Sequence, residues 1–289
     1  MYLIFDTETT GLPKRWDAPL SDSENWPRCI QIAWQIHDAK GNLIAHKDYL
    51  IQPDDFTIPF DSEQIHGIST ALATSEGVPL ATVLSEFEEV LKEVSFVVGH
   101  NVSFDRNIMG AEFIRAGLAD PLDEKAVIDT CTEETAQLCQ LPGGRGGKFK
   151  LPTLGELYHF LFQDSFEEAH NATADVEATS RAFLELMRQE KLHPEATGYA
   201  EDTNELKTIT APFQLAGLKH QNLKEASKKL KKEIKSPITV EPSVDGVLAD
   251  VSYVHLHNHS QFSVLQATSR VSQLVGAAAQ YQMPALALT

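Results

Sequence analysis

Two carboxylates lie close together near the start of the chain, where they could bind a metal ion. Asp6 and Glu8 follow the apolar run at residues 2–5. If this run is a β-strand, its period of two points both side chains to one face, with Cα atoms about 6.5–7 Å apart. Mg²⁺ prefers oxygen ligands of this kind. Acidic pairs are also common on protein surfaces, so the spacing becomes informative only together with further motifs.

Two further motifs place chemically active side chains at the start of an expected helix. In residues 99–105 (Gly-His-Asn-Val-Ser-Phe-Asp), Asp105 falls in the first helical turn. Farther along, His170 precedes Asp175 by five residues. The helix dipole alone can explain an acid in a first turn, and a loop histidine can be a cap or a surface residue. The alternative is that these side chains join the first carboxylate pair in one site.

Apolar periodicity predicts the elements that would position these motifs. Three strands that form a meander come first, and helices alternate with two short strands afterwards. This order indicates an α/β protein with a mixed five-stranded sheet and flanking helices. The expected strands are 2–5, 30–36, 43–51, 96–98 and 127–128, and the expected helices are 80–94, 104–118, 130–138, 153–162 and 173–187.

Taken together, the three motifs resemble those of the DEDDh exonuclease family, which includes the epsilon proofreading subunit of bacterial DNA polymerase III. The first motif is Asp6-x-Glu8, the second ends in Asp105, and the third is His170 with Asp175 five residues on. The resemblance covers about residues 1–190. It implies a ribonuclease-H-like sheet with the first motif on the central strand.

The resemblance also implies a role for each residue of the three motifs. Asp6, Glu8 and Asp175 would bind two Mg²⁺ or Mn²⁺ ions directly, and Asp105 would complete the second metal site. Two cations about 3.5–4 Å apart across the scissile phosphate stabilise both the attacking and the leaving oxygen. His170 would be the general base, a role typically worth ~10²–10⁴ in rate. The product would be a nucleoside 5′-monophosphate.

Other residues match positions that contact substrate in this family. The resemblance suggests that a terminal nucleotide lies against a small set of side chains and backbone groups, although Phe104 could equally fill the core. The matching positions are Thr7, Thr9, Leu12, His66 and Phe104.

Three more residues near the motifs have structural interpretations. Trp16 and Trp26 lie in the loop at 14–28 and could stack on a DNA strand, but ordinary loop packing is the favoured interpretation. Asp129 lies at a strand end, and we expect it to cap the helix that begins near Thr130.

Composition restricts the class of protein. The formal net charge of −17 argues against a broad basic surface, so any contact with nucleic acid should be local. The three cysteines are too few for a disulfide framework and fit a cytoplasmic setting. No apolar run reaches the length of about 18 residues that a membrane span needs, and the first residues do not look like a signal peptide. We therefore expect no membrane association.

A lysine-rich segment interrupts this acidic background. Residues 219–235 hold seven lysines against Glu225 and Glu233. The favoured interpretation is a solvated helix within a linker at 191–250, and the alternative is a helix that tracks DNA. Nearby, residues 214–218 loosely resemble a sliding-clamp-binding peptide without its final aromatic residue.

The end of the chain carries alternating histidines. His255, His257 and His259 lie on an expected strand, where two of them can reach one metal from the same face. With the sequence that follows, residues 251–289 resemble the opening of the PHP domain of bacterial polymerase III alpha subunits. By that pattern His257 and His259 would be ligands of an incomplete metal site.

The leading hypothesis is a proofreading 3′→5′ DNA exonuclease that acts on single-stranded or frayed 3′ ends. The tail suggests that the chain is the N-terminal part of a polymerase III alpha-type polymerase, with the exonuclease in cis. One alternative is an RNA-trimming exonuclease, which contacts to the 2′-hydroxyl would distinguish. A second alternative is a non-catalytic scaffold module of a replicase.

Overall fold

The computed structural model describes residues 1–166, 171–193, 205–208, 210–214, 216–218, 221–234 and 271–280. The chain divides into two compact units, residues 1–236 and residues 237–289. In the second unit, the described part is helix α10 (Val271–Gln280). None of the helices in these ranges has the length and hydropathy required to cross a membrane.

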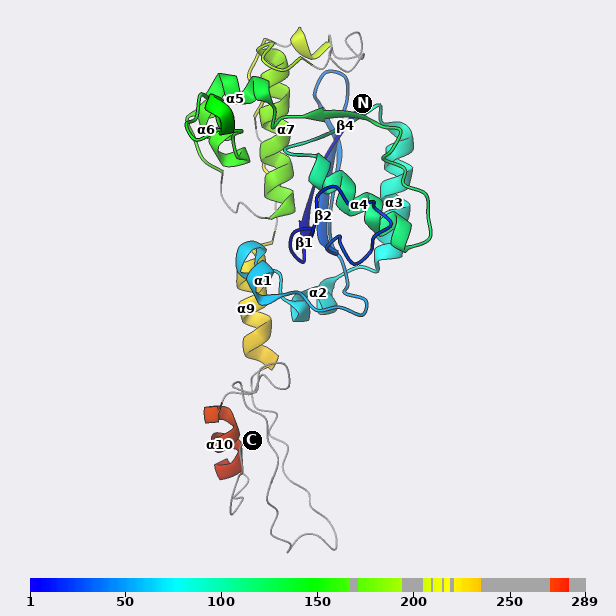
Figure 1. Cartoon of the computed structure of the whole chain (residues 1–289), viewed down its shortest axis with the longest axis vertical. Helices are drawn as coiled ribbons and strands as arrows, with labels where there is room; N and C mark the ends of the chain where they lie inside the picture. Colours follow the sequence, from blue (N-terminus) through cyan, green and yellow to red (C-terminus); the bar gives the residue numbers. More distant parts are fainter. Residues whose placement is uncertain are drawn as a thin grey trace, which may run out of the picture. The chain divides into compact units, whose positions relative to one another are not determined.

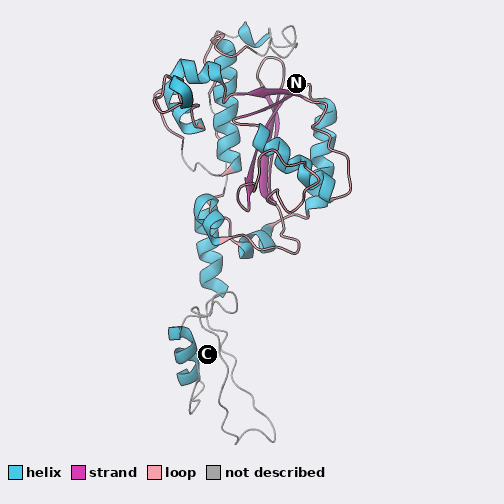
Figure 2. Ribbon diagram, in the orientation of Figure 1, coloured by secondary structure: helices cyan, strands magenta, loops and turns pink. Residues whose placement is uncertain are grey.

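A mixed five-stranded sheet forms the centre of the first unit, with strand order β3-β2-β1-β4-β5 (Figures 1 and 2). β1 pairs antiparallel with β2, which pairs antiparallel with β3, so the predicted meander is confirmed. On its other edge β1 pairs parallel with β4, and β4 pairs parallel with β5. The strands are β1 (Tyr2–Thr9), β2 (Cys29–His37), β3 (Leu43–Leu50), β4 (Phe96–Gly99) and β5 (Ala126–Asp129).

Helices cover both faces of the sheet, as Figure 1 shows. Their positions agree broadly with the apolar periodicity, but the structure adds the short helices α1 and α2 between β3 and α3. The helices of the first unit with seven or more residues are α1 (Phe60–His66), α2 (Thr70–Glu76), α3 (Leu80–Glu93), α4 (Ser103–Arg115), α5 (Glu133–Cys139), α6 (Leu154–Phe162), α7 (Ala172–Arg188) and α9 (Leu223–Ile234).

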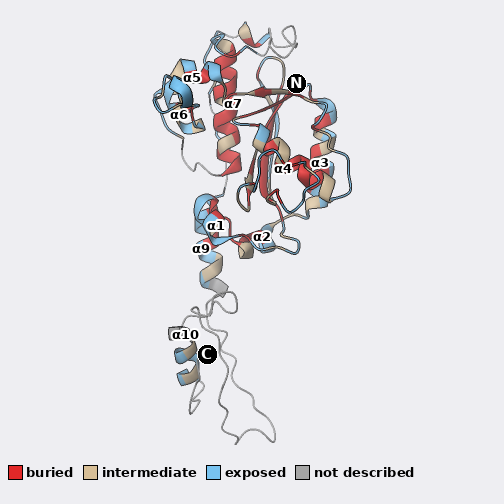
Figure 3. Ribbon diagram, viewed as in Figure 1, coloured by how far each residue is buried: buried red, intermediate tan, exposed pale blue. Residues whose placement is uncertain are grey.

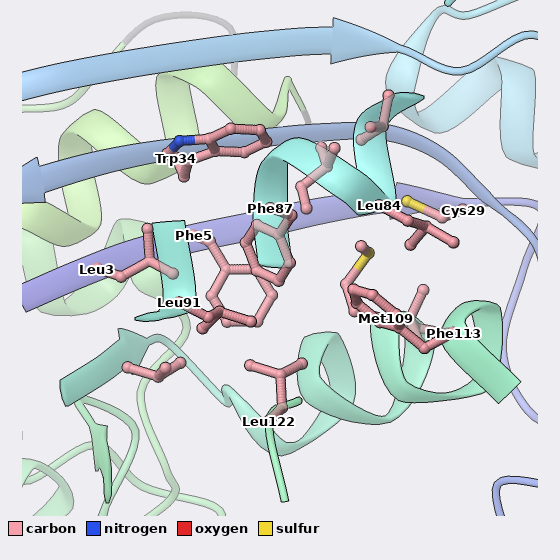
Figure 4. Close-up of a cluster of buried hydrophobic side chains, with 14 of the residues drawn as sticks. Leu3, Phe5, Cys29, Trp34, Leu84, Phe87, Leu91, Met109, Phe113 and Leu122 are labelled. Carbon is pink, nitrogen blue, oxygen red and sulfur yellow. The ribbon is translucent and has the colours of Figure 1, made fainter. Parts of the chain in front are cut away.

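The alternating side chains of β1 divide the core into two layers. Leu3 and Phe5 pack with α3 and α4, whereas Tyr2 and Ile4 pack with α6 and α7. All four are at most 1% exposed. Figure 4 shows the first layer, in which Phe87 of α3 lies beside Phe5. The first half of β1 is therefore buried on both faces, and its packing fixes the strand that carries Asp6 and Glu8.

The strand that carries the first motif is longer than predicted. β1 continues to Thr9, so Asp6 and Glu8 lie on the central strand, as the resemblance implied, and the strand extends past both of them. The strand pairing explains the extension, because Glu8 is in register with Gln31 of β2. A run of apolar residues predicted only the buried first half of the strand.

The prediction that Asp129 caps α5 is wrong. α5 begins at Glu133, and the hydroxyl of Thr132 accepts a hydrogen bond from the Thr135 amide at its first turn. The Asp129 carboxylate accepts instead from the backbone amides of Asn101 and Cys131, at 2.8 and 2.7 Å. It thereby ties the loop after β4 to the end of β5.

Helix α9 differs from the solvated helix expected in the lysine-rich segment. Leu223 is 5% exposed and packs in a small cluster with Ile68 and Leu72. The hydroxyl of Ser227 donates to the Gly67 carbonyl at 2.7 Å, and the Ser69 amide donates to the same hydroxyl at 3.0 Å. One face of α9 is therefore packed on the segment of α1 and α2 within the first unit, and other faces are exposed (Figure 3).

The buried aromatic cluster predicts a large effect of one truncation. The Phe87 ring lies 5.3 Å from the Phe5 ring and 5.4 Å from the Trp34 ring. Phe87→Ala should lower the free energy of unfolding by about 3–5 kcal/mol, because it leaves a cavity against β1. Urea denaturation measures this loss. The control, Leu118→Ala at a half-exposed side chain, should change stability by about 0.5 kcal/mol or less.

Candidate active site

Carboxylates from β1 and α7 meet at the end of the central strand. Asp6 and Glu8 share the face of β1 that carries Tyr2 and Ile4, and this is the face that α7 covers. Asp175 lies in the first turn of α7. One carboxylate oxygen from each of Asp6, Glu8 and Asp175 lies within 4.8 Å of the other two. Two motifs far apart in the sequence thus form one cluster.

The start of α7 is tied to the sheet by side-chain amides. Asn171 caps the helix, because its side-chain oxygen accepts from the Thr173 amide at 3.1 Å. Gln31 of β2 accepts from the Ala172 amide at 3.2 Å and donates to the Asn171 side chain at 3.3 Å. Because Gln31 is the register partner of Glu8, these bonds place the first turn of α7 against the β1 carboxylates.

Asp105 lies beside the cluster, on the other face of β1. It belongs to the first turn of α4, which is separated from the end of β4 by three residues, and it is 4% exposed. The backbone amide and the hydroxyl of Thr7 both donate to Asp105 Oδ1, at 2.9 and 2.7 Å. Thr7 lies between Asp6 and Glu8 on the opposite face of β1, so one strand segment positions carboxylates from both layers.

Burial and mutual repulsion disfavour the charged forms of these acids. Burial, together with the charges of Asp175 and Asp105, raises the pKa of Glu8 to about 8, against an opposing contribution from Lys224. Burial also raises the pKa of Asp6, to which three neighbouring carboxylates add. The pKa of Asp105 is raised to about 7 because burial outweighs the opposing hydrogen bonds from Thr7. The positive charge of Lys224 therefore compensates these acids only in part.

The residues of the cluster fit a divalent cation. The donors are all carboxylate oxygens, which are the ligands that hard cations prefer. A cation between them would replace repulsion by attraction and restore ordinary ionisation. Asp6, Glu8 and Asp175 are the residues that could hold it, with Asp105 adjacent on the α4 side.

The other predicted site residues differ in their exposure and in their hydrogen bonds. The Thr9 hydroxyl donates to the Gly11 carbonyl at 2.7 Å, within the turn after β1. Leu12 is 74% exposed, whereas His66 is 4% exposed and its Nδ1 accepts from the Ile68 amide. Leu12 is thus free to touch a ligand, whereas His66 is largely enclosed.

The aromatic residues near the first motif differ in their surroundings. The ring centroid of Phe104 lies 5.9 Å from that of Trp16, which is 57% exposed. Trp26 is 3% exposed and donates from its indole nitrogen to the Pro19 carbonyl at 3.1 Å. Trp26 therefore packs in the core, whereas Trp16 and Phe104 form an aromatic pair that solvent reaches.

Several predictions lie outside the described residues. These include the positions of the general-base candidate, of the tail histidines and of part of the clamp-like peptide: His170, His255, His257, His259 and Leu215.

Sequence reasoning missed three contributors to the site. Gln31 and Asn171 hold the α7 start, and Lys224 acts on the charge of Glu8. Asn171 had a detectable signal, because asparagine just before a helix is a favoured N-cap. Gln31 and Lys224 had none, because only the strand register and the docking of α9 bring them here.

Substitution of one carboxylate distinguishes the effect of charge repulsion on stability from the effect of metal binding. Asp175→Asn should not lower the melting temperature in EDTA, since it removes one of several like charges. Addition of Mn²⁺ or Mg²⁺ should stabilise the unaltered protein, by about 2.7 kcal/mol when the ion is at 100 times its Kd. The variant should lose most of this stabilisation in a thermal scan.

A matched control for this measurement is Asp123→Asn, which removes an exposed carboxylate outside the cluster. It should retain the full stabilisation by either ion. Equal stabilisation of Asp175→Asn and the unaltered protein would show that the cluster is not the metal site.

Comparisons with known proteins agree with this geometry. A family model described as Exonuclease matches residues 3–183, and a PHP domain model matches residues 255–289. Two solved structures of E. coli exonuclease I share the fold, one in complex with a dA16 oligonucleotide and one a zinc-bound complex with single-stranded DNA. The first has 20% identity and a TM-score of 0.52, and covers 73% of this chain and 45% of that one. The second has 22% identity and a TM-score of 0.52, with coverages of 68% and 42%.

Curated relatives match the same part of the chain. DNA polymerase III PolC-type from Streptococcus sanguinis (strain SK36) is 34% identical over 181 residues, which is 62% of this chain and 11% of that protein. The enzyme of the same name from Streptococcus pyogenes serotype M18 (strain MGAS8232) is 34% identical over 187 residues, covering 65% and 11%. The chain therefore spans about a tenth of the length of these relatives. The match of the family model over more than half of its residues shows that this chain belongs to the exonuclease family.

Proposed function

We propose that this chain is a metal-dependent 3′→5′ DNA exonuclease that removes nucleotides from single-stranded or frayed 3′ ends, as a proofreading enzyme does. The observation that carries the proposal is the meeting of Asp6, Glu8 and Asp175 within 4.8 Å at the end of the central strand. These acids come from two motifs that are 167 residues apart along the chain, and the fold brings them together. Unrelated surface acids would not be expected to converge in this way.

In this proposal the carboxylates hold two Mg²⁺ or Mn²⁺ ions. Asp6, Glu8 and Asp175 are the direct ligands, and Asp105 contributes from the α4 side. When bound, such ions stabilise the attacking and leaving oxygens of a phosphoryl transfer. Thr7 keeps Asp105 in place through two hydrogen bonds, so it acts as a positioning residue.

His170 is the proposed general base. It directly precedes Asn171, the N-cap that is bonded to Gln31 and to the first turn of α7. A histidine suits the task because its ordinary pKa lies near neutral pH. It would take a proton from the water that attacks the terminal phosphodiester. Cleavage of this bond yields a nucleoside 5′-monophosphate and shortens the strand by one nucleotide.

The exposed side chains around the cluster are the proposed contacts for the terminal nucleotide. Leu12 stands out from the turn after β1, and Phe104 forms an accessible pair with Trp16. Bases of any sequence can stack on such aromatic and apolar surfaces. Thr7, Thr9 and His66 would contribute backbone or enclosed polar groups.

The PolC-type relatives support a polymerase context for this exonuclease. We propose that it acts beside a polymerase III alpha-type polymerase joined in cis, which would raise its effective concentration at a primer end. Contact of residues 214–218 with a sliding clamp, and metal binding by His257 and His259, belong to the same proposal. The structural similarity to exonuclease I concerns the fold alone.

Degradation of end-labelled oligonucleotides tests the proposed activity. With Mg²⁺ or Mn²⁺, a 5′-labelled DNA strand should shorten stepwise and a 3′ label should appear as a mononucleotide. Asp6→Ala should abolish this activity because it removes a metal ligand. His170→Ala should lower the rate by about 10²–10⁴ because proton transfer loses its base. Asp123→Asn is the control and should retain full activity.

The same assay distinguishes the alternatives. Cleavage of RNA but not of DNA would favour an RNA-trimming enzyme. A protein that binds neither ion in calorimetry and cleaves neither polymer would be a non-catalytic module. Release of dinucleotides, or shortening from the 5′ end, would contradict the proposed direction and product.

A further inference from the structure

Helix α9 docks beside the carboxylate cluster. The side-chain nitrogen of Asn171, the N-cap of α7, donates to the Gln221 carbonyl just before α9 at 3.2 Å. Farther along, Ser227 bridges Gly67 and Ser69, the residues that join α1 and α2. Helix α9 and the residue Gln221 before it are therefore fixed at both the α7 side and the α1–α2 side of the site, and Figure 1 shows α9 beside α1.

The docking places Lys224 tightly against the α1–α2 turn. Gly67 has a φ of +81° in that turn, and a Cβ on it would overlap the backbone and stem of Lys224. Lys224 lies three residues after Gln221, whose carbonyl accepts from Asn171, and its side chain is exposed. Its charge is therefore held near the start of α7, the helix that carries Asp175 in its first turn.

Lysines on α9 differ in whether they face the groove beside α1. Lys224 and Lys228 are four residues apart, so they share one face, and they line a groove between α1 and α9. Lys229 is exposed but lies about 100° farther around the helix than Lys228. Lys231 forms an ion pair with Glu63 of α1, and this pair neutralises the carboxylate that lines the groove. The groove thus keeps an excess of positive charge.

The position of this groove indicates its ligand. The formal net charge of the chain is −17, so a cationic groove beside an acidic site is a local exception. A strand whose terminal phosphate is at the carboxylates carries more phosphates along its backbone. Neutralisation of such phosphates by Lys and Arg side chains is a main source of the affinity of proteins for nucleic acids. An acidic protein partner would need no proximity to the cluster.

We propose that Lys224 and Lys228 bind backbone phosphates of the single-stranded DNA that enters the exonuclease site. The inference rests on the proposed DNA exonuclease function and adds the path of the strand behind its 3′ end. The two lysines act as binding residues and take no part in the bond cleavage.

The test is the salt dependence of DNA binding. The intact chain is titrated with a fluorescent oligo(dT) in EDTA, where no turnover occurs, at several NaCl concentrations. Each phosphate contact to single-stranded DNA contributes about 0.7 to the slope of log K against log[salt]. Lys224→Gln and Lys228→Gln should each make this negative slope shallower by about that amount. Lys229→Gln removes the same charge and should leave the slope nearly unchanged.

A second variant controls for loss of folding. Lys228→Arg keeps the charge at the same position and should retain the slope of the unaltered protein. Melting temperatures of all variants establish that each is folded. Unchanged slopes in Lys224→Gln and Lys228→Gln, or an equal decrease in Lys229→Gln, would overturn the proposal.

The binding test and the cleavage test can fail separately. If the unaltered protein cleaves DNA but the lysine variants keep their salt slope, only the strand path is wrong. If the slopes change as expected but no DNA is cleaved with either metal, the groove binds DNA and the proposed exonuclease activity is wrong.

Discussion

The partial burial and mutual repulsion of the carboxylates at the end of β1 are the constraint on which this structure depends. Asp6, Glu8 and Asp105 all have raised pKa values, and burial is the largest cause for each of them. Placing such groups together and away from water destabilises the folded state, so stability alone would favour separating or exposing them. Keeping them together requires rigid support from both sides of the strand, and it makes a divalent cation a strongly favoured ligand.

The central strand supplies that support because its two faces belong to two different cores. Phe5 anchors β1 against α3 and α4, whereas Ile4 anchors it against α6 and α7. The same alternation continues past the apolar half of the strand, so Thr7 faces Asp105 while Asp6 and Glu8 face α7. A shift of one residue in register would exchange these faces and dismantle the site. Strand pairing therefore controls the chemistry directly.

The sequence was sufficient for whatever depends on short-range pattern. Strand periodicity and motif spacing predicted the meander, the mixed sheet and the family. Local rules failed at Asp129, because capping preferences do not reveal that its carboxylate accepts from the Asn101 amide of another loop as well as from the nearby Cys131 amide. They also missed α1 and α2, since seven-residue helices are too short to show clear periodicity. The packing of Ser227 against Gly67 joins residues 160 apart, which no local pattern encodes.

The docking of α9 also bears on how so acidic a chain could approach DNA. At about 0.15 M salt, exposed charges are screened beyond about 8 Å, so most of the acidic surface has little effect on a strand end at the cluster. The local balance then decides, and there the carboxylates oppose DNA until cations neutralise them. Metal ions can compensate the cluster itself, and lysines on α9 can compensate the neighbouring phosphates. Affinity for DNA would then depend on bound metal at the end of the strand and on salt along its backbone, which are two separable contributions.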